Sequence, residues 1–295
     1  MITVLLSTYN GAKYLREQID SILAQDSVEV RLVVRDDGST DGTLDILHEY
    51  SEKGQLTYYS GPNLGPQRAF LQMLKDAPDS DYYAFADQDD FWKPEKLYMA
   101  VKFLICKKAE LYYCQTQLVD ESLQPLPNQI PIKPLGTFTE SLIYKFIGGC
   151  TMVMTKKLRD KVNLYTPERL SMHDVWVYSV ALGLGYEVAF DPKPHILYRQ
   201  HGHNVLGQGQ GKMKIWKDRW TRFKNSESER YVTACEIWKG YGRLMPDSTR
   251  RPLVYFIAAK KSFFKRMKLL FSNEFTCASK PIRRMFRLNL LFNTY

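Results

Sequence analysis

Residues 82–92 of this 295-residue chain read YYAFADQDDFW, an apolar aromatic run that opens into three carboxylates and returns to aromatic residues. The run Tyr82–Ala86 predicts a buried strand of a parallel sheet, because such strands are apolar on both faces. Asp87, Asp89 and Asp90 would repel one another at the end of that strand, so folding alone does not explain them. A divalent cation would relieve the repulsion, and Mg²⁺ and Mn²⁺ prefer oxygen ligands of this kind. The alternative is a solvated acidic turn.

Strand and helix patterns alternate on either side of this run. Apolar, β-branched segments are separated by stretches whose apolar residues repeat at helical spacing, such as Leu15, Ile19 and Ile22. The alternation predicts an α/β fold with a mostly parallel sheet and helices on both faces. Ligands of such sheets bind beyond the carboxyl ends of the strands, where the acidic residues fall. The predicted strands are residues 2–8, 28–34, 56–59, 82–86, 111–119, 187–190 and 195–198.

Charge is distributed unevenly along the chain. Residues 1–206 carry 21 Lys and Arg against 26 Asp and Glu, whereas residues 207–295 carry 20 against six. The first segment has the balance of an ordinary enzyme, and the second predicts a basic, aromatic, helical region that meets an anionic surface. The five cysteines form no C-x-x-C pair, and the sequence pattern leads us to expect neither a leader nor a membrane-spanning run. We therefore expect a cytoplasmic protein.

A second pair of acids, Asp36 and Asp37, follows an early predicted strand and precedes Gly38. Asp and Gly are common turn formers, so a plain turn would explain the pair. A carboxylate at this place can also accept a hydrogen bond from a nucleobase or a ribose hydroxyl. In the acidic run at residues 87–90, we expect Asp89 to bind the metal directly and Asp87 to reach the ribose or a metal-bound water.

Two further clusters lie late in the chain. Asp174 begins an apolar helix, where it is either a plain N-cap or a general base, since a helix N-terminus keeps a carboxylate ionised. His173 is either a neighbour in that network or a surface residue. His201 and His203, on a glycine loop, are either separate hydrogen-bonding groups, or one of them completes a metal site or contacts a diphosphate, and Arg199 could do the same.

Together these motifs resemble those of family-two glycosyltransferases with the GT-A fold, a Rossmann-like nucleotide-diphospho-sugar transferase architecture. The resemblance covers about residues 1–206. Its D-Q-D-D-x-W, H-D and Y-R-Q-H-G forms look most like the bacterial rhamnosyltransferases of cell-surface polysaccharide synthesis. The matching segments are residues 7–10, 36–41, 63–65, 87–92, 173–174 and 198–202.

The resemblance implies a role for each matching residue. Asp87 and Asp89 would be the D-x-D pair that holds ribose and Mg²⁺ or Mn²⁺, His201 would lie near the metal, and Asp174 would be the base of an inverting transfer. Pro66-Gln67-Arg68 departs from the family pattern, which leaves open whether Arg68 binds phosphate or is surface charge. The residues expected to bind the nucleotide sugar are Ser7, Tyr9, Asp36, Asp37, Asn63, Arg68, Asp87 and Arg199. Those expected to border the acceptor are Gly148, Gly149, Cys150 and His173.

The implied reaction is an inverting, metal-dependent transfer of a sugar to a glycan, which we expect to be lipid-linked. The resemblance favours dTDP-L-rhamnose as the donor, and a UDP-hexose stays open. A nucleotidyltransferase is a less favoured alternative, because residues 7–12 lack the basic phosphate loop expected of such an enzyme. Nucleic acid is not expected as a partner, because the acidic strand ends would repel phosphate in the absence of a metal.

The basic C-terminal region, residues 207–295, allows two interpretations. Residues 260–271 interleave bases with large apolar side chains, and residues 283–287 add three arginines. Such a helix either packs on the catalytic domain with a solvated basic face or lies on an anionic membrane. We expect a GT-A domain at residues 1–206, a C-terminal region at residues 207–295, and peripheral attachment to the inner face of the cell membrane.

Overall fold

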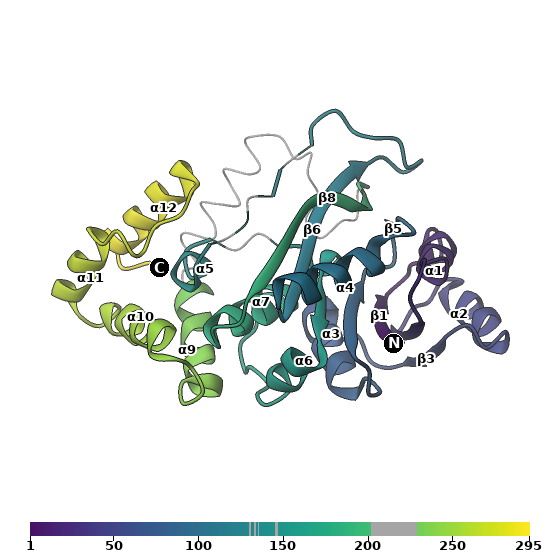
Figure 1. Ribbon diagram of the computed structural model, residues 1–295, viewed down its shortest axis with the longest axis horizontal. Coiled ribbons are helices and arrows are strands. Elements are labelled where there is room, and N and C mark those ends of the chain that lie inside the picture. The colour runs from purple at the N-terminus through teal and green to yellow at the C-terminus, as the bar shows by residue number, and fades with distance from the viewer. Residues whose placement is uncertain (130, 133, 135, 145–146, 202–228) are drawn as a thin grey trace.

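The computed structural model describes residues 1–129, 131–132, 134, 136–144, 147–201 and 229–295. Within this part of the chain, eight strands form one mixed sheet in the order β3-β2-β1-β4-β7-β6-β8-β5 (Figure 1). The first four are parallel, β7 and β5 run antiparallel to their neighbours, and β6 pairs with β8 in parallel. The strands are β1 (Ile2–Thr8), β2 (Val30–Asp36), β3 (Thr57–Ser60), β4 (Tyr82–Ala86), β5 (Phe91–Trp92), β6 (Leu111–Val119), β7 (Val153–Thr155) and β8 (Val188–Arg199).

Helices cover both faces of the sheet, as predicted. The central strands are buried on both sides, so Val4 and Leu6 of β1 belong to one hydrophobic core and Leu5 to the other. One face carries α1 (Leu15–Leu23), α2 (Thr43–Glu52) and α4 (Lys96–Lys107). The other carries α3 (Gly65–Asp76), α5 (Phe138–Ser141), α6 (Lys156–Val162) and α7 (His173–Gly183). A 3₁₀ turn, η1 (Gly149–Thr151), leads into β7.

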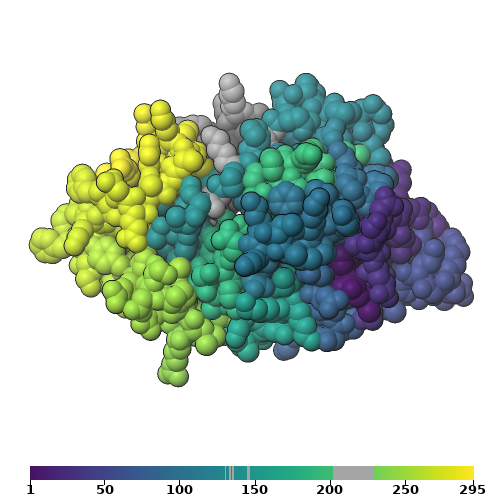
Figure 2. All heavy atoms as spheres, in the orientation of Figure 1, coloured from purple at the N-terminus to yellow at the C-terminus, as the bar shows by residue number. Residues whose placement is uncertain are grey.

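The C-terminal region is helical, as predicted, and lies at one end of the molecule (Figures 1 and 2). It consists of α9 (Glu229–Tyr241), α10 (Asp247–Ala259), α11 (Phe263–Leu270) and α12 (Lys280–Leu291). Ile237 and Tyr241 of α9 share a core with Trp176 of α7, and the Tyr241 hydroxyl donates to the Val162 carbonyl at 2.9 Å. The expected boundary between residues 206 and 207 lies outside the described residues. Within the described part, no helix combines the length and apolarity that a bilayer crossing needs.

The predicted interruption of a strand between residues 190 and 195 is wrong. The sequence predicts two short strands at residues 187–190 and 195–198, because Pro192 and Pro194 interrupt the run. The structure has a single strand, β8, whose pairing with β6 shifts register opposite Cys114, Gln115 and Thr116. Proline has no N–H to donate to a neighbouring strand. The irregular pairing accommodates Pro192 and Pro194, so the strand continues to Arg199.

Candidate active site

The acidic turn, residues 87–90, joins β4 to β5 at the carboxyl edge of the sheet. Gln88 fixes this turn against the end of β1. Its Oε1 accepts hydrogen bonds from the Thr8 hydroxyl at 2.7 Å and the Tyr9 N–H at 2.8 Å, and its Nε2 donates to the Tyr9 carbonyl at 3.2 Å. Since β1 and β4 are parallel neighbours, their carboxyl ends meet at this edge, where sheets of this kind bind their ligands.

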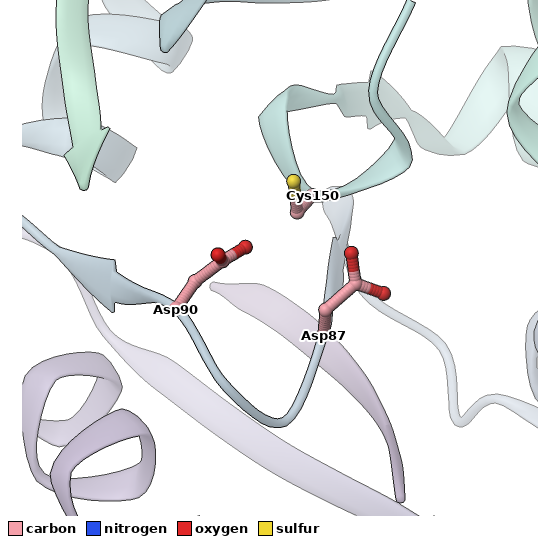
Figure 3. A group of neighbouring side chains, drawn as sticks. All are labelled: Asp87, Asp90 and Cys150. Atoms are coloured by element: carbon pink, nitrogen blue, oxygen red, sulfur yellow. The ribbon is translucent and has the colours of Figure 1, made fainter. Parts of the chain in front are cut away.

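Asp87 and Asp90 point toward Cys150, which η1 brings to the same place (Figure 3). A carboxylate oxygen of each aspartate and the Cys150 Sγ all lie within 4.8 Å of one another. Asp90 is fully buried, and its Oδ2 has no hydrogen-bond partner in the described residues. Burial, helped by the charges of Asp89 and Asp174, raises the pKa of Asp87 to about 7. Burial and the charges of Asp89 and Asp87 raise the pKa of Asp90 well above its ordinary value.

This group of side chains fits a divalent cation. Asp90 is buried and Asp87 is partly buried, and Mg²⁺ or Mn²⁺ would stabilise the ionised form of both. The unpartnered oxygen of Asp90 is available to a ligand. The Cys150 thiol suits such an ion less well, because burial raises its pKa and a protonated sulfur is a poor partner for a hard cation. Asp87 is among the ligands predicted from the sequence, whereas Asp90 is not.

Asp89, predicted as the direct metal ligand, faces His201. Its Oδ2 lies 2.8 Å from Nε2 of that imidazole. Arg199 stabilises the same turn through two hydrogen bonds. Its Nε donates to the Asp89 carbonyl at 2.9 Å, and its backbone N–H donates to Asp90 Oδ1 at 3.2 Å. Arg199 Nη2 also pairs with Glu17 at 2.5 Å, and the Arg199 side chain is only 1% exposed. The structure therefore gives Arg199 a positioning role, and its expected contact with the donor stays a prediction.

The second acidic pair, at the end of β2, is engaged within the chain. Asp36 Oδ2 accepts two backbone N–H groups of the following turn at 3.0 Å, and its Oδ1 accepts the Ser39 hydroxyl. Asp37 forms a buried ion pair with Arg35 at 2.8 Å and accepts the Leu64 N–H at 3.0 Å. These bonds join the β2 turn to the loop before α3. A carboxylate oxygen can accept more than one hydrogen bond, so Asp37 can still receive a ligand donor.

Asp174 lies in the first turn of α7 and is almost fully buried. Its Oδ2 accepts the Gly149 N–H at 3.2 Å and its Oδ1 accepts the Val175 N–H at 2.6 Å. Burial raises the pKa of Asp174 to about 6, against the opposing effect of these hydrogen bonds. Its charge in turn raises the pKa of Asp87, so the expected base lies close to the acidic turn. A carboxylate with a pKa near neutrality can both accept and release a proton at physiological pH.

His173 lies beneath η1, so the expected alternative of a surface residue is wrong. Its ring stacks on Phe70 with centroids 4.2 Å apart and meets Phe85 edge-on at 5.0 Å. Burial lowers the pKa of His173 to about 3, so the imidazole is neutral. Neither ring nitrogen has a hydrogen-bond partner among the described residues. A Cβ added to Gly149 would come within 2.4 Å of His173 Nε2, so this close approach requires glycine.

The remaining predicted residues lie around this edge of the sheet. Ser7 is half-buried near the end of β1, and Tyr9 is exposed just beyond it. Asn63 accepts the Gly65 N–H at 2.9 Å, within the loop that Asp37 holds. Arg68 is exposed on α3, with Nη2 3.5 Å from the Glu168 carbonyl. Their roles in donor binding stay predictions.

Lys96 was not predicted from the sequence. It is fully buried in α4, its ammonium lies 3.4 Å from the centroid of the Trp92 ring, and it has no hydrogen-bond partner among the described residues. Burial lowers the pKa of Lys96 to about 8, while the charges of Cys114, Cys150 and Asp90 act in the opposite direction. A lysine in a helix is normally solvated, and its spacing of four residues from Trp92 was the only available signal.

Acids gathered at the carboxyl edge of an α/β sheet, with the buried carboxylate of Asp174 near them, are typical of an enzyme active site. The chain belongs to glycosyl transferase family 2, whose sequence pattern matches residues 3–162. It is therefore a glycosyltransferase, and its fold is GT-A.

Known relatives and structures agree with this family. The dTDP-rhamnosyl transferase RfbG of Shigella flexneri is 28% identical over 263 residues, which cover 80% of this chain and 89% of that protein. Residues 1–349 of S. aureus TarS, in complex with UDP-GlcNAc, superpose with a TM-score of 0.62 at 20% identity, over 100% of this chain and 81% of that one. The mannosyltransferase PcManGT from Pyrobaculum calidifontis, in complex with GDP-Man and Mn²⁺, gives 0.56 at 16% identity, over 100% and 80%.

Proposed function

We propose that this glycosyltransferase moves a sugar from a nucleotide diphosphate to a glycan hydroxyl in one inverting step, with a divalent cation held at the acidic turn. The observation that carries the proposal is the proximity of Asp174 to that turn. Asp174 is buried with a pKa of about 6, and its charge affects the pKa of Asp87. One carboxylate is thus available as a base, while the others are available to a cation.

Asp174 would take the proton of the acceptor hydroxyl. The N–H groups of Gly149 and Val175 orient its two oxygens, so the carboxylate is held in place before the acceptor arrives. The acceptor oxygen then forms a bond to the anomeric carbon of the donor. The bond from that carbon to the diphosphate breaks, and its electron pair leaves with the nucleoside diphosphate. A single displacement from the opposite side inverts the anomeric centre.

Asp87 and Asp90, with the Asp89–His201 pair beside them, would hold Mg²⁺ or Mn²⁺. When bound, such a cation neutralises negative charge on the departing diphosphate. The chain's own contribution is the shape of the turn, which Gln88 fixes from one side and Arg199 from the other. The Mn²⁺ in the PcManGT complex supports the use of a divalent ion here.

For the donor we favour dTDP-L-rhamnose, and the similarity to RfbG supports this choice. The UDP-GlcNAc bound by TarS keeps a UDP-linked hexose as the second candidate. We assign nucleotide-sugar binding to the rim formed by Ser7, Tyr9, Asp36, Asp37, Asn63 and Arg68. The acceptor would be a lipid-linked glycan of cell-wall or capsular polysaccharide synthesis. Gly148, Gly149 and Cys150 would border it, and His173 would support them from beneath.

A thermal-shift screen of nucleotide sugars tests the proposal. We expect dTDP-L-rhamnose to raise the melting temperature when Mn²⁺ is present and to do so much less in EDTA, because a ligand that binds only the folded state stabilises it. Turnover should release dTDP. Release of pyrophosphate would indicate a nucleotidyltransferase, and the absence of any Mn²⁺-dependent shift with dTDP-, UDP- or GDP-sugars would contradict the proposed metal-dependent binding of the donor. A shift with a UDP-sugar alone would replace the favoured donor.

A further inference from the structure

α11 and α12 carry large apolar side chains on a surface that the rest of the described structure leaves open. The two helices pack against each other at the end of the molecule opposite β3 (Figure 1). Phe264 and Phe271 are 85% and 79% exposed. Phe264 lies in the first turn of α11, and Phe271 is the residue that caps its C-terminal end. Phe263, which is also exposed, lies next to them in the sequence.

α12 is apolar on two sides. Phe286 and Leu290 are buried in the core that they share with Phe256, which explains why the helix packs where it does. The opposite side of α12 carries Leu288 and Leu291, which are 46% and 49% exposed. A surface helix normally presents polar residues to water, so exposed leucines on this side are unusual.

Basic side chains flank these apolar groups. Lys265 and Lys268 are exposed on α11, and Arg284 and Arg287 are exposed on α12. Neither helix contains an aspartate or a glutamate. We call these exposed residues of the two packed helices the outer face; its members are Phe263, Phe264, Phe271, Leu288 and Leu291 with Lys265, Lys268, Arg284 and Arg287.

We infer that the outer face docks on an anionic lipid bilayer. Aromatic side chains with flanking lysines and arginines are what an interfacial helix needs, since the rings enter the acyl boundary while the cations meet anionic headgroups. A second copy of this chain fits less well, because a twofold contact would bring the basic rims of both outer faces together. The inference does not depend on which sugar the enzyme transfers.

Flotation of the full chain with vesicles tests the inference without any turnover. We expect the protein to float with vesicles of phosphatidylcholine and phosphatidylglycerol and to stay below vesicles of phosphatidylcholine alone. Salt should weaken the binding because it screens the attraction between the basic residues and the headgroups. Phe264→Ser with Phe271→Ser should lower the partition coefficient by about tenfold or more, because the rings supply the apolar burial.

The surface of α4 offers a matched control. Ile105 is 63% exposed there, and Leu164, on the loop after α6, is 60% exposed. Changing both to serine removes two exposed apolar side chains elsewhere and should leave flotation unchanged. Equal binding by the two double variants, or no binding of the wild type to anionic vesicles, would overturn the inference. Sedimentation without lipid tests whether a second copy of this chain binds the outer face instead. If the wild type is a dimer and the variant Phe264→Ser with Phe271→Ser is a monomer, the outer face is a contact between copies.

Discussion

At the level of single residues, Asp174 combines burial with two backbone hydrogen bonds and a pKa of about 6. Asp174→Asn keeps the shape and removes the base, so we expect turnover to fall by about 10²–10⁴-fold. Donor affinity should change little, because the proton is taken from the acceptor. In the wild type, turnover should fall by roughly tenfold for each pH unit below about 6, because only the ionised carboxylate accepts a proton.

Asp45 is the control for this substitution, because it also lies in the first turn of a helix but is exposed on α2. Steady-state turnover and donor calorimetry should leave Asp45→Asn equal to the wild type. If Asp174→Asn turned over at the wild-type rate, another group would have to be the base.

The residue types of the site could be predicted from the sequence better than their individual roles. Asp87 and Asp89 stand out because folding alone does not explain several acids at the end of an apolar strand, whereas Asp174 could equally be an N-cap and stands out only beside the other motifs. Asp90 could not be distinguished from its neighbours, because the turn that buries it depends on Gln88 reaching back to β1 over 79 residues of sequence. The burial of Lys96 against Trp92 likewise follows from how α4 docks, which no local pattern encodes.

At the level of elements, η1 depends on one glycine. A methyl group on Gly149 would meet the His173 ring at 2.4 Å, and that ring is held between Phe70 and Phe85. We expect Gly149→Ala to destabilise the fold by about 1–3 kcal/mol, the usual cost of overpacking. It should also lower turnover, since the Gly149 N–H orients Asp174.

Gly148→Ala is the matched control for this prediction. The same methyl group there would make only ordinary contacts, at 3.7 Å from Cys150 and Thr151. Urea unfolding of both variants compares them directly. Equal loss of stability would mean that the backbone of the turn, rather than the close approach to His173, limits this element.

Elements with a strong local pattern were predicted with accurate bounds. β1, β4 and β6 were predicted residue for residue, because each is rich in apolar, β-branched or aromatic residues and most of its residues are buried in the sheet. β8 was predicted as two pieces, because prolines in a sequence indicate a break. Its continuity comes from the neighbouring β6, whose register shift accommodates them. That shift is a tertiary property, so the alternation of residues along β8 alone could not predict it.

At the level of the whole molecule, the buried acids lower the stability that the rest of the fold provides. Burial raises the pKa of Asp87 to about 7 and raises that of Asp90 well above its ordinary value, so the folded state binds protons that the unfolded state releases. For such groups, stability is highest below the unfolded pKa near 4 and falls as the pH rises through the folded pKa. Above about pH 7, Asp87 is ionised in the folded state, and its desolvation lowers the free energy of unfolding in full unless a cation neutralises its charge.

A cation should therefore stabilise this protein more as the pH rises. At the proposed site, Mg²⁺ would compete with protons for Asp87 and Asp90, so we expect the Mg²⁺-dependent rise in melting temperature to be larger at pH 8 than at pH 6. Asp90→Asn removes one buried charge. In EDTA at pH 8 it should melt higher than the wild type by roughly a few degrees, and Mg²⁺ should raise its melting temperature less. Differential scanning fluorimetry measures both effects, with Asp45→Asn as the control that should follow the wild type. A Mg²⁺ effect that is equal at both pH values, or undiminished in Asp90→Asn, would mean that the ion binds elsewhere, because the acidic turn is the place where its charge would relieve the largest repulsion.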